Sequence, residues 1–397
     1  MNALLVPQPS WPTVCLGEIA EMCLGKMLDA KKNKGRPQPY LRNPNIRWFD
    51  VDLSNVQFMR FEEREDERYG LSAGDVVVCE GGEAGRAAIW DGRVPNMKFQ
   101  KAIHRIRCGP RLDRRFLVHR LMWDYFSGRL TDYYTGATIK HLTGQDLARY
   151  QFPLPPVPEQ RRIADILDKA DALRAKRRAV LKQLDELTQS IFLDMFGDPA
   201  TNPKGWTIAP LLSLCTRVTD GTHQPPPWSP SGHPFLFVSN ITSGELTFDT
   251  TKFISDETHA ELMRHCPIEV GDVLYSTVGS YGVPAVVRSN RKFAFQRHIA
   301  HLKPDRDAVE PEFLRTMLAS SPLKRQADRA ARGIAQKTVN LADIRKFVVF
   351  KPPLEAQRAL VERVSAIREL HAMQSESLAS CDALFSSLQH RAFQGDL

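Results

Sequence analysis

The stretch GATIKHLTGQDLARYQFPLPPVPEQRRI, residues 136–163, decides the fold because the chain contains it twice. It returns 197 positions later, at residues 333–360, as GIAQKTVNLADIRKFVVFKPPLEAQRAL. The two copies share Gly136 with Gly333, Lys140 with Lys337, Asp146 with Asp343, Pro155-Pro156 with Pro352-Pro353, and Gln160 with Gln357. Matches that keep one register over this length indicate an internal duplication, and we expect each copy to fold as a like unit.

The duplication continues in both directions from this stretch. Upstream, Trp11, Tyr40, Asn45 and Ile46 match Trp206, Phe235, Asn240 and Ile241, each 195 positions later. Downstream, Phe196 matches Phe393 at the offset of 197. The change of offset is typical of an insertion in a loop. Two like units about a pseudo-twofold axis suit a partner with approximate twofold symmetry, and duplex DNA is the obvious one.

Each copy is predicted to form a mixed α/β globule followed by one long helix, which is an α+β fold class. Two strand-like runs flank a glycine-rich turn, at 75–79 and 86–90 in the first copy and at 272–275 and 283–287 in the second. Proline-rich hinges at 152–158 and 351–354 separate globule from helix. The predicted boundaries are 1–152 for the first globule, 153–200 for its helix, 201–350 for the second globule and 351–397 for the second helix.

Apolar residues in both predicted helices recur at alternating steps of three and four, which is the spacing of a coiled-coil seam. The seam residues are Ile163, Ile166, Ala170, Leu173, Arg177, Val180, Leu184, Leu187 and Ile191 in the first helix, and Leu360, Ile367, Leu370, Gln374, Cys381, Leu384 and Leu388 in the second. We expect the helices to pair with each other as an antiparallel coiled coil. That pairing brings Arg177 to Gln374 as a central polar pair; the alternative is that Arg177 extends to water.

Composition narrows the class of protein. A formal charge of +8 over 397 residues favours a polyanionic partner only weakly. The seven cysteines are scattered and form no Cys-x-x-Cys, which argues against a disulfide framework and a zinc site. No apolar run reaches the roughly 18 residues that span a bilayer, and no signal pattern opens the chain. We therefore expect a cytoplasmic protein without a metal site.

The sequence lacks the motifs that carry catalysis. It contains no phosphate-binding Gly-x-x-x-x-Gly-Lys-Ser/Thr loop, no Gly-x-Ser-x-Gly elbow and no His-Glu-x-x-His. Asn43-Pro44 and Asn202-Pro203 lack the second proline and the aromatic of an amino-methyltransferase loop, so they are interpreted as turns. We expect no catalytic residue and no cofactor in this chain.

A basic loop in the first copy is the first candidate for DNA contact. Glycine and proline keep it out of regular structure, and one aromatic accompanies its cations: Lys26, Lys31, Lys32, Lys34, Arg36, Tyr40 and Arg42. Such loops suit phosphate contact and reach into a groove. The alternative is an ordinary solvated lysine loop.

Other candidate loops differ between the copies while their framework residues match. At the position that matches the basic loop, the second copy has Thr222, His223 and Gln224, whose side chains can donate hydrogen bonds to base edges or accept them. A second pair of matching loops has Lys98, Lys101 and Arg105 in the first copy and Arg297 and His298 in the second. A third pair has Thr138, Lys140 and His141 in the first copy and Gln336 and Lys337 in the second. The turn residues Ser280 and Tyr281 of the second copy complete the candidates. A shared scaffold with different polar tips is what two readers of two short sequences need.

The duplication, the hinges and the paired helices resemble the specificity subunits of type I restriction-modification systems. The resemblance covers the whole chain and is most specific in residues 136–163, in the junction MFGDP at 195–199, and in LFSSLQHRAF at 384–393. It implies that each globule is a target recognition domain and each helix a conserved spacer. Each domain would read one half of a bipartite, asymmetric DNA sequence, and the helices would set the gap between the halves.

The resemblance also implies partners. Two modification subunits that use S-adenosylmethionine would dock along the helices, and restriction subunits that use ATP and Mg would join them. A specificity subunit of a methylation-only complex has the same sequence features. Two other classes stay open at this stage: a free-standing DNA-binding regulator, and an unrecognised enzyme such as a nuclease.

Overall fold

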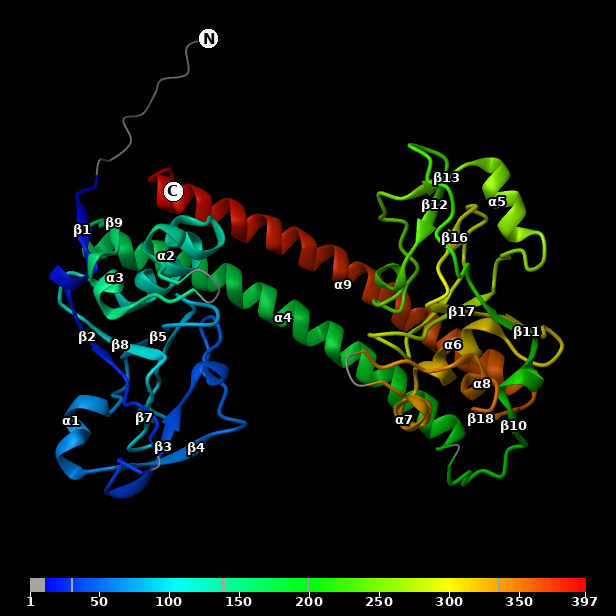
Figure 1. The fold of residues 1–397 in the computed structure, drawn as a ribbon, viewed down its shortest axis with the longest axis horizontal. Helices are drawn as coiled ribbons and strands as arrows, with labels where there is room; N and C mark the ends of the chain where they lie inside the picture. Colours follow the sequence, from blue (N-terminus) through cyan, green and yellow to red (C-terminus); the bar gives the residue numbers. More distant parts are fainter. Residues whose placement is uncertain (1–10, 30, 137–139, 199, 334–335) are drawn as a thin grey trace, which may run out of the picture. The chain divides into compact units, whose positions relative to one another are not determined.

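Two runs of buried residues, Val76–Cys79 and Val273–Ser276, form central strands of two like sheets. The computed structural model describes residues 11–29, 31–136, 140–198, 200–333 and 336–397. The chain divides into two units, which are described separately. Unit 1 comprises Met1–Lys176 with Ser377–Leu397, and unit 2 comprises Arg177–Glu376. Each unit therefore contains one globule together with one half of each long helix (Figure 1).

Unit 1 is built on three small sheets. The largest has the order β2-β8-β5-β6 and is antiparallel throughout, with β2 at Ala20–Leu24, β8 at Ile103–Cys108, β5 at Val76–Cys79 and β6 at Ala87–Ile89. The second has the order β4 (Gln57–Phe61), β3 (Arg36–Leu41), β7 (Lys98–Phe99), and β3 runs parallel to β7. The third pairs β1 (Thr13–Cys15) with β9 (Gln151–Pro153). The short helices are α1 (Asp66–Tyr69), α2 (Arg114–Phe126) and α3 (Gly144–Arg149).

Unit 2 repeats this topology strand for strand. Its largest sheet has the order β11 (Cys215–Asp220), β17 (Ile299–Pro304), β14 (Val273–Ser276), β15 (Pro284–Val286). The second has the order β13 (Phe253–Ile254), β12 (His233–Leu236), β16 (Ala294–Phe295), and the third pairs β10 (Ile208–Pro210) with β18 (Val348–Phe350). Its shorter helices are α5 (Asp256–Met263), α6 (Pro311–Ala319), α7 (Ser321–Ala330) and α8 (Leu341–Ile344). The prediction of two like α+β units is confirmed.

The predicted hairpins form in both copies. β5 pairs antiparallel with β6, and β14 with β15, in the same relative register. Gly85 and Gly282 end the connecting turns at φ values of 98° and 89°, a conformation that a side chain strongly disfavours. The glycines therefore serve chain reversal, as the sequence predicted.

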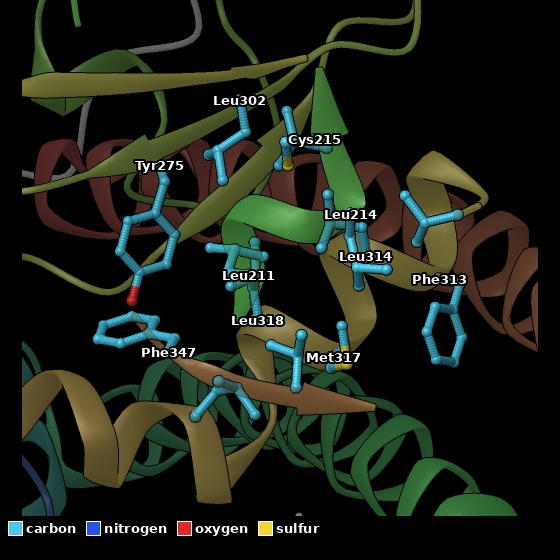
Figure 2. Packing of buried hydrophobic residues seen from close by; sticks show 14 of the residues in the cluster. Leu211, Leu214, Cys215, Tyr275, Leu302, Phe313, Leu314, Met317, Leu318 and Phe347 are labelled. Carbon is cyan, nitrogen blue, oxygen red and sulfur yellow. The ribbon is translucent and has the colours of Figure 1, made fainter. Parts of the chain in front are cut away.

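A dense core fixes the globule of unit 2 onto its helix halves. Figure 2 shows Leu214, Tyr275, Leu302 and Met317 converging from a short 3-10 turn, two strands of the large sheet and α6. Phe313, on α6, also contacts the aromatic side chains at the end of the long helix α4 (Val157–Phe196), with a ring centroid 5.1 Å from that of Phe196. Fully burying side chains of this size contributes about 1.5–3 kcal/mol each, so this core defines the orientation of the strands.

A buried glutamine secures each proline hinge. The Gln160 Nε2 donates to the carbonyl oxygens of Arg111 and Pro155, each at 2.8 Å, and its Oε1 accepts from the Asp113 amide at 2.7 Å. Gln357 makes the equivalent three bonds in unit 2. Both side chains are fully buried, which explains why this glutamine belongs to the repeated stretch.

The two long helices are α4 (Val157–Phe196) and α9 (Leu354–Gln394). Within unit 1 they run antiparallel, since Arg162 Nη2 donates to the Leu397 carbonyl at 2.7 Å and Arg174 Nε donates to Asp382 at 2.6 Å. Within unit 2, Arg177 Nη1 donates to Gln374 Oε1 at 2.8 Å. This is the central polar contact that antiparallel pairing predicts.

Four of the sixteen predicted seam residues face outward. Ile163, Ala170 and Leu184 are buried as expected, but Leu173, Leu187, Leu370 and Leu384 are 48%, 46%, 39% and 50% exposed. Leu167 and Phe385 are buried one position after a predicted residue, and Val364 and Ala392 are buried at positions that the predicted seam did not include. The leucine pattern misled the prediction because an arginine, Arg174, takes an inward position that the leucine beside it was expected to fill.

Candidate nucleic-acid interface

In unit 2, four loops that are distant in sequence meet at one end of the large sheet. The Arg297 amide donates to the Thr222 carbonyl at 3.0 Å, which joins the loop after β11 to the β16–β17 turn. The Gly279 amide donates to the Lys337 carbonyl at 3.0 Å, which joins the β14–β15 turn to the loop before α8. The structure therefore brings the four predicted candidate segments of this copy together.

The loops enclose a polar groove with a volume of about 340 Å³. Three predicted residues line it, namely Arg297, His298 and Gln336. Burial, with a smaller contribution from the charge of Arg297, lowers the pKa of His298, so its imidazole is neutral at pH 7. A neutral imidazole, an amide and a guanidinium together offer both donors and acceptors, which is the equipment that base-edge recognition requires.

The groove also contains polar residues that the sequence analysis missed. Thr277, Thr338 and Asn340 line it beside the predicted residues. Thr338 pairs with Val278 through an isolated β-bridge, which draws its segment to the β14–β15 hairpin. Thr338 and Asn340 lie in the duplicated stretch 333–360. Their position in this repeat is the sequence feature that could have identified them as groove residues.

Unit 1 gathers its loops in the same way. The Lys101 amide donates to the Lys26 carbonyl at 2.7 Å, and His141 forms isolated bridges with both Gly81 and Thr135. The side chains of Lys101, Lys140 and His141 are exposed, and the Lys140 ammonium lies 5.7 Å from the Tyr134 ring centroid. Thr138, also predicted here, lies outside the described residues.

A glycine permits the close approach of the loops in each unit. A Cβ on Gly25 would lie 2.1 Å from the Gln100 carbonyl oxygen, and one on Gly221 would lie 2.1 Å from that of Phe295. Contacts that short are impossible for a real side chain. Only glycine therefore lets the first candidate loop of each copy pack against the turn before β8 or β17.

Four predicted DNA contacts in unit 1 are wrong because their side chains belong to the interior. Lys26 is 9% exposed and its Nζ lies 2.5 Å from Glu65 Oε2, while Lys98 is 3% exposed and pairs with Asp66 at 2.6 Å. Tyr40 is 4% exposed within a small apolar cluster. A buried charge stays buried only when it is paired, and these partners account for both lysines.

Arg105 is the fourth buried residue, at 2% exposure. Its Nη1 donates to the carbonyls of Glu67, Arg68 and Gly70, at 3.2, 3.0 and 2.8 Å, and its Nη2 lies 3.0 Å from Glu21 Oε1. A guanidinium offers five donors and can satisfy several carbonyls at a helix end. Arg105 thus holds the end of α1, and it is unavailable to DNA.

The other predicted residues divide into exposed and partly buried groups. Arg42, Thr222 and Tyr281 are partly buried and hydrogen-bonded to Asn55, Gln224 and Asp328 respectively. His223 lies 3.1 Å from Asp220 and is exposed. The remaining exposed side chains are those of Lys31, Lys32, Lys34, Arg36, Gln224, Ser280 and Lys337.

Over the described ranges, no group of three or more histidine, cysteine, aspartate or glutamate side chains has an arrangement that could hold a metal ion. In the same part of the chain, no helix combines the length and apolar character needed to cross a membrane.

The fold and the loop faces define a class: a duplicated α+β protein in which each unit presents a polar loop face and carries half of two paired helices. Residues 9–183 match the family described as the type I restriction modification DNA specificity domain. The chain is therefore similar to type I restriction-modification specificity subunits, through this domain in its first half and through relatives that match along its whole length. This confirms the family predicted from the repeat, and with it a specificity subunit rather than an enzyme.

Individual relatives extend the match over the whole chain. The specificity subunit of the type I restriction enzyme EcoBI of Escherichia coli is 25% identical over 429 residues, covering 100% of this chain and 88% of the relative. The EcoKI specificity subunit of Escherichia coli strain K12 is 23% identical over 306 residues, covering 71% of this chain and 65% of the relative.

Solved structures share the fold. A chain from a type I restriction-modification system superimposes with a TM-score of 0.53 at 22% identity, covering 98% of this chain and 99% of its own length. The S subunit from M. genitalium gives a TM-score of 0.52 at 15% identity, covering 99% of this chain and 98% of its own length.

Proposed function

We propose that this chain gives a type I restriction-modification complex its DNA sequence specificity, with each unit reading one half of a bipartite, asymmetric target. One observation carries the proposal: in each unit the loops that differ between the two repeats converge at the same end of the large sheet. Loops on a conserved scaffold are where recognition residues concentrate. Two different faces on two like units fit a target with two different halves.

The chemistry of the two faces supports different modes of contact. Unit 1 presents exposed cations, including Lys31, Lys32 and Lys101, which suit phosphate oxygens. Unit 2 presents Gln224, Arg297 and Gln336, whose side chains can form paired hydrogen bonds with base edges. We therefore assign more of the base readout to unit 2 side chains than to the lysines of unit 1.

The outward leucines of the helices support protein partners. Leu173 and Leu384 are exposed in unit 1, and Leu187, Leu370 and Met373 in unit 2. Large apolar side chains repeated along exposed helix surfaces are typical of docking sites. We propose that two modification subunits dock on these surfaces and that those subunits bind S-adenosylmethionine. Restriction subunits, which bind ATP and Mg, would then join the complex.

The test is to express the chain with a cognate modification subunit in a host without other methylation and to sequence the methylome. The expected result is methylation of adenine within one bipartite, asymmetric sequence that requires both proteins. The control is each protein expressed alone. Methylation at a continuous site, or DNA cleavage by the purified chain with magnesium and no partner, contradicts the proposal.

A free-standing regulator predicts a different outcome. Light scattering of the purified chain with and without the modification subunit distinguishes the two functions, because a scaffold forms a larger complex. Nanomolar, sequence-specific binding by the chain alone, with no complex formed, favours the regulator.

A further inference from the structure

Cys266, His301 and Asp272 form a connected row in unit 2. The Cys266 Sγ lies 3.4 Å from His301 Nδ1, and His301 Nε2 lies 2.7 Å from Asp272 Oδ2. His301 and Asp272 are 1% and 2% exposed, while Cys266 is partly exposed. A thiol beside an imidazole that a buried carboxylate orients is the arrangement that activates a cysteine as a nucleophile.

The charges around the thiol favour its ionised form. Burial acts to raise the pKa of Cys266, but the His301 hydrogen bond and the positive charges of His301, Arg217 and Lys303 outweigh it and leave the pKa lowered. Burial likewise acts to lower the pKa of His301, and bonds to Asp272 and Cys266 reverse this and raise it. Cys266 therefore ionises more readily than an isolated thiol, and His301 holds a proton more readily than an isolated imidazole.

The row opens into a cavity of about 200 Å³. Its lining includes Cys266, His301, Arg217 and His265, together with residues 219–222 at the end of β11. A bound water occupies roughly 30 Å³, so the cavity has space for a group of a few heavy atoms attached to the sulfur. Asp220 contributes the acidic group of the lining.

Unit 1 lacks this arrangement at the matching position. His301 pairs with Leu274 across the sheet, and Arg105 pairs with Val77, which is 197 positions before Leu274. The guanidinium of Arg105 is instead occupied by three carbonyl oxygens of residues 67–70. The difference between the two copies therefore lies at Cys266 and His301, since Asp272 belongs to the shared scaffold as the counterpart of Asp75, 197 positions earlier.

Three other cysteines provide a contrast. Burial raises the pKa of Cys79 to about 11 and those of Cys108 and Cys215 to about 12. Thiols of this kind stay protonated and inert at neutral pH.

We propose that Cys266 is a modification site that exchanges with small, uncharged disulfides. His301 takes the proton of Cys266, and the thiolate attacks one sulfur of the disulfide. The bond between the two disulfide sulfurs breaks as a new bond to Cys266 Sγ forms. The second sulfur leaves as a thiolate and receives the proton from the His301 imidazolium. The exchange is reversed by excess thiol.

The experiment treats the purified full-length chain with 2-hydroxyethyl disulfide and follows each cysteine by peptide mass spectrometry. Cys266 is expected to react about tenfold or more faster at pH 7 than Cys15, Cys23 and Cys381, which are also partly exposed. The rate should rise with pH around a midpoint below about 8.5, the ordinary thiol pKa. Equal rates, or a midpoint at or above that value, overturn the proposal.

Matched histidine variants test the role of the imidazole. His301→Gln is expected to slow the reaction of Cys266 about tenfold, while His265→Gln, which changes a histidine of the same cavity, leaves the rate within about twofold. A folded His301→Gln chain that reacts as fast as the unaltered chain overturns the proposal. If that variant fails to fold, the pH profile of the unaltered chain decides.

Discussion

Arg174 of α4 lies over the ring of Phe385 of α9, with its guanidinium carbon 4.2 Å from the ring centroid. The same guanidinium donates to Asp382 at 2.6 Å and to Asp171 at 2.8 Å. A planar cation that stacks on an aromatic face and keeps two carboxylate partners can occupy an inward position between helices at little desolvation cost. This contact sets the observed helix register in unit 1.

The first prediction tests that register with two adjacent residues. Phe385 is 2% exposed and Leu384 is 50% exposed. Phe385→Ala should destabilise the chain by about 3–5 kcal/mol through loss of burial and creation of a cavity, whereas Leu384→Ala should change the stability by about 0.5 kcal/mol or less. Urea unfolding of both variants measures this. A larger loss for Leu384→Ala would restore the register expected from the leucine pattern.

The second prediction separates two lysines of one turn. Lys98 is buried against Asp66, and Lys101 is exposed. Lys98→Ala should lower the urea midpoint, because it leaves a cavity where a side chain only 3% exposed was packed, and a folded variant should keep its salt dependence of DNA binding. Lys101→Ala should leave the midpoint unchanged and reduce the slope of log affinity against log salt by about 1. If the Lys98 variant instead reduced the salt slope and kept the urea midpoint, Lys98 would be a DNA contact as the sequence predicted.

The sequence predicts those features of the fold that repeat along the chain, and it does not predict features that depend on single contacts. The duplication, the hairpins, the hinges and the antiparallel helices are repeated over many residues, so chance substitutions do not hide them. The burial of Lys26 or Arg105 depends instead on single acidic or carbonyl partners, Glu65 and the end of α1, that lie about 40 residues away. A basic loop and a buried ion pair have the same composition, and only the fold distinguishes them.

The third prediction concerns base readout in unit 2. Arg297→Ala should weaken binding of the specific target by about 1–3 kcal/mol and relax selectivity at one position of one half-site. Arg264→Ala provides the control, since Arg264 is exposed just after α5 and outside the groove lining. Binding of the assembled complex to target variants measures both. A uniform loss across all sequences would make Arg297 a phosphate contact, and relaxed selectivity in both half-sites would contradict the assignment of one half to each unit.

The fourth prediction follows from the pair of His301 and Asp272. Burial acts to lower the pKa of His301 and to raise that of Asp272, but their hydrogen bond and opposite charges outweigh burial in both. The pKa of His301 is thus raised above 6.5, so its contribution to stability is complete below that pH and is lost as pH rises through the folded-state pKa. The pKa of Asp272 is lowered below 3.8, so its contribution is lost only in stronger acid.

Urea unfolding checks this in a Cys266→Ser background, which removes the titration of the neighbouring thiol. The difference in the free energy of unfolding between that chain and its His301→Gln variant should be largest near about pH 5.5 and should shrink by about pH 8.5, because the imidazole loses its charge over that interval. Other titrating groups are common to both chains, so they cancel in the difference. A gap that stays constant or widens with pH would mean that His301 is held by packing alone, and that its bond to Asp272 does not favour the imidazolium.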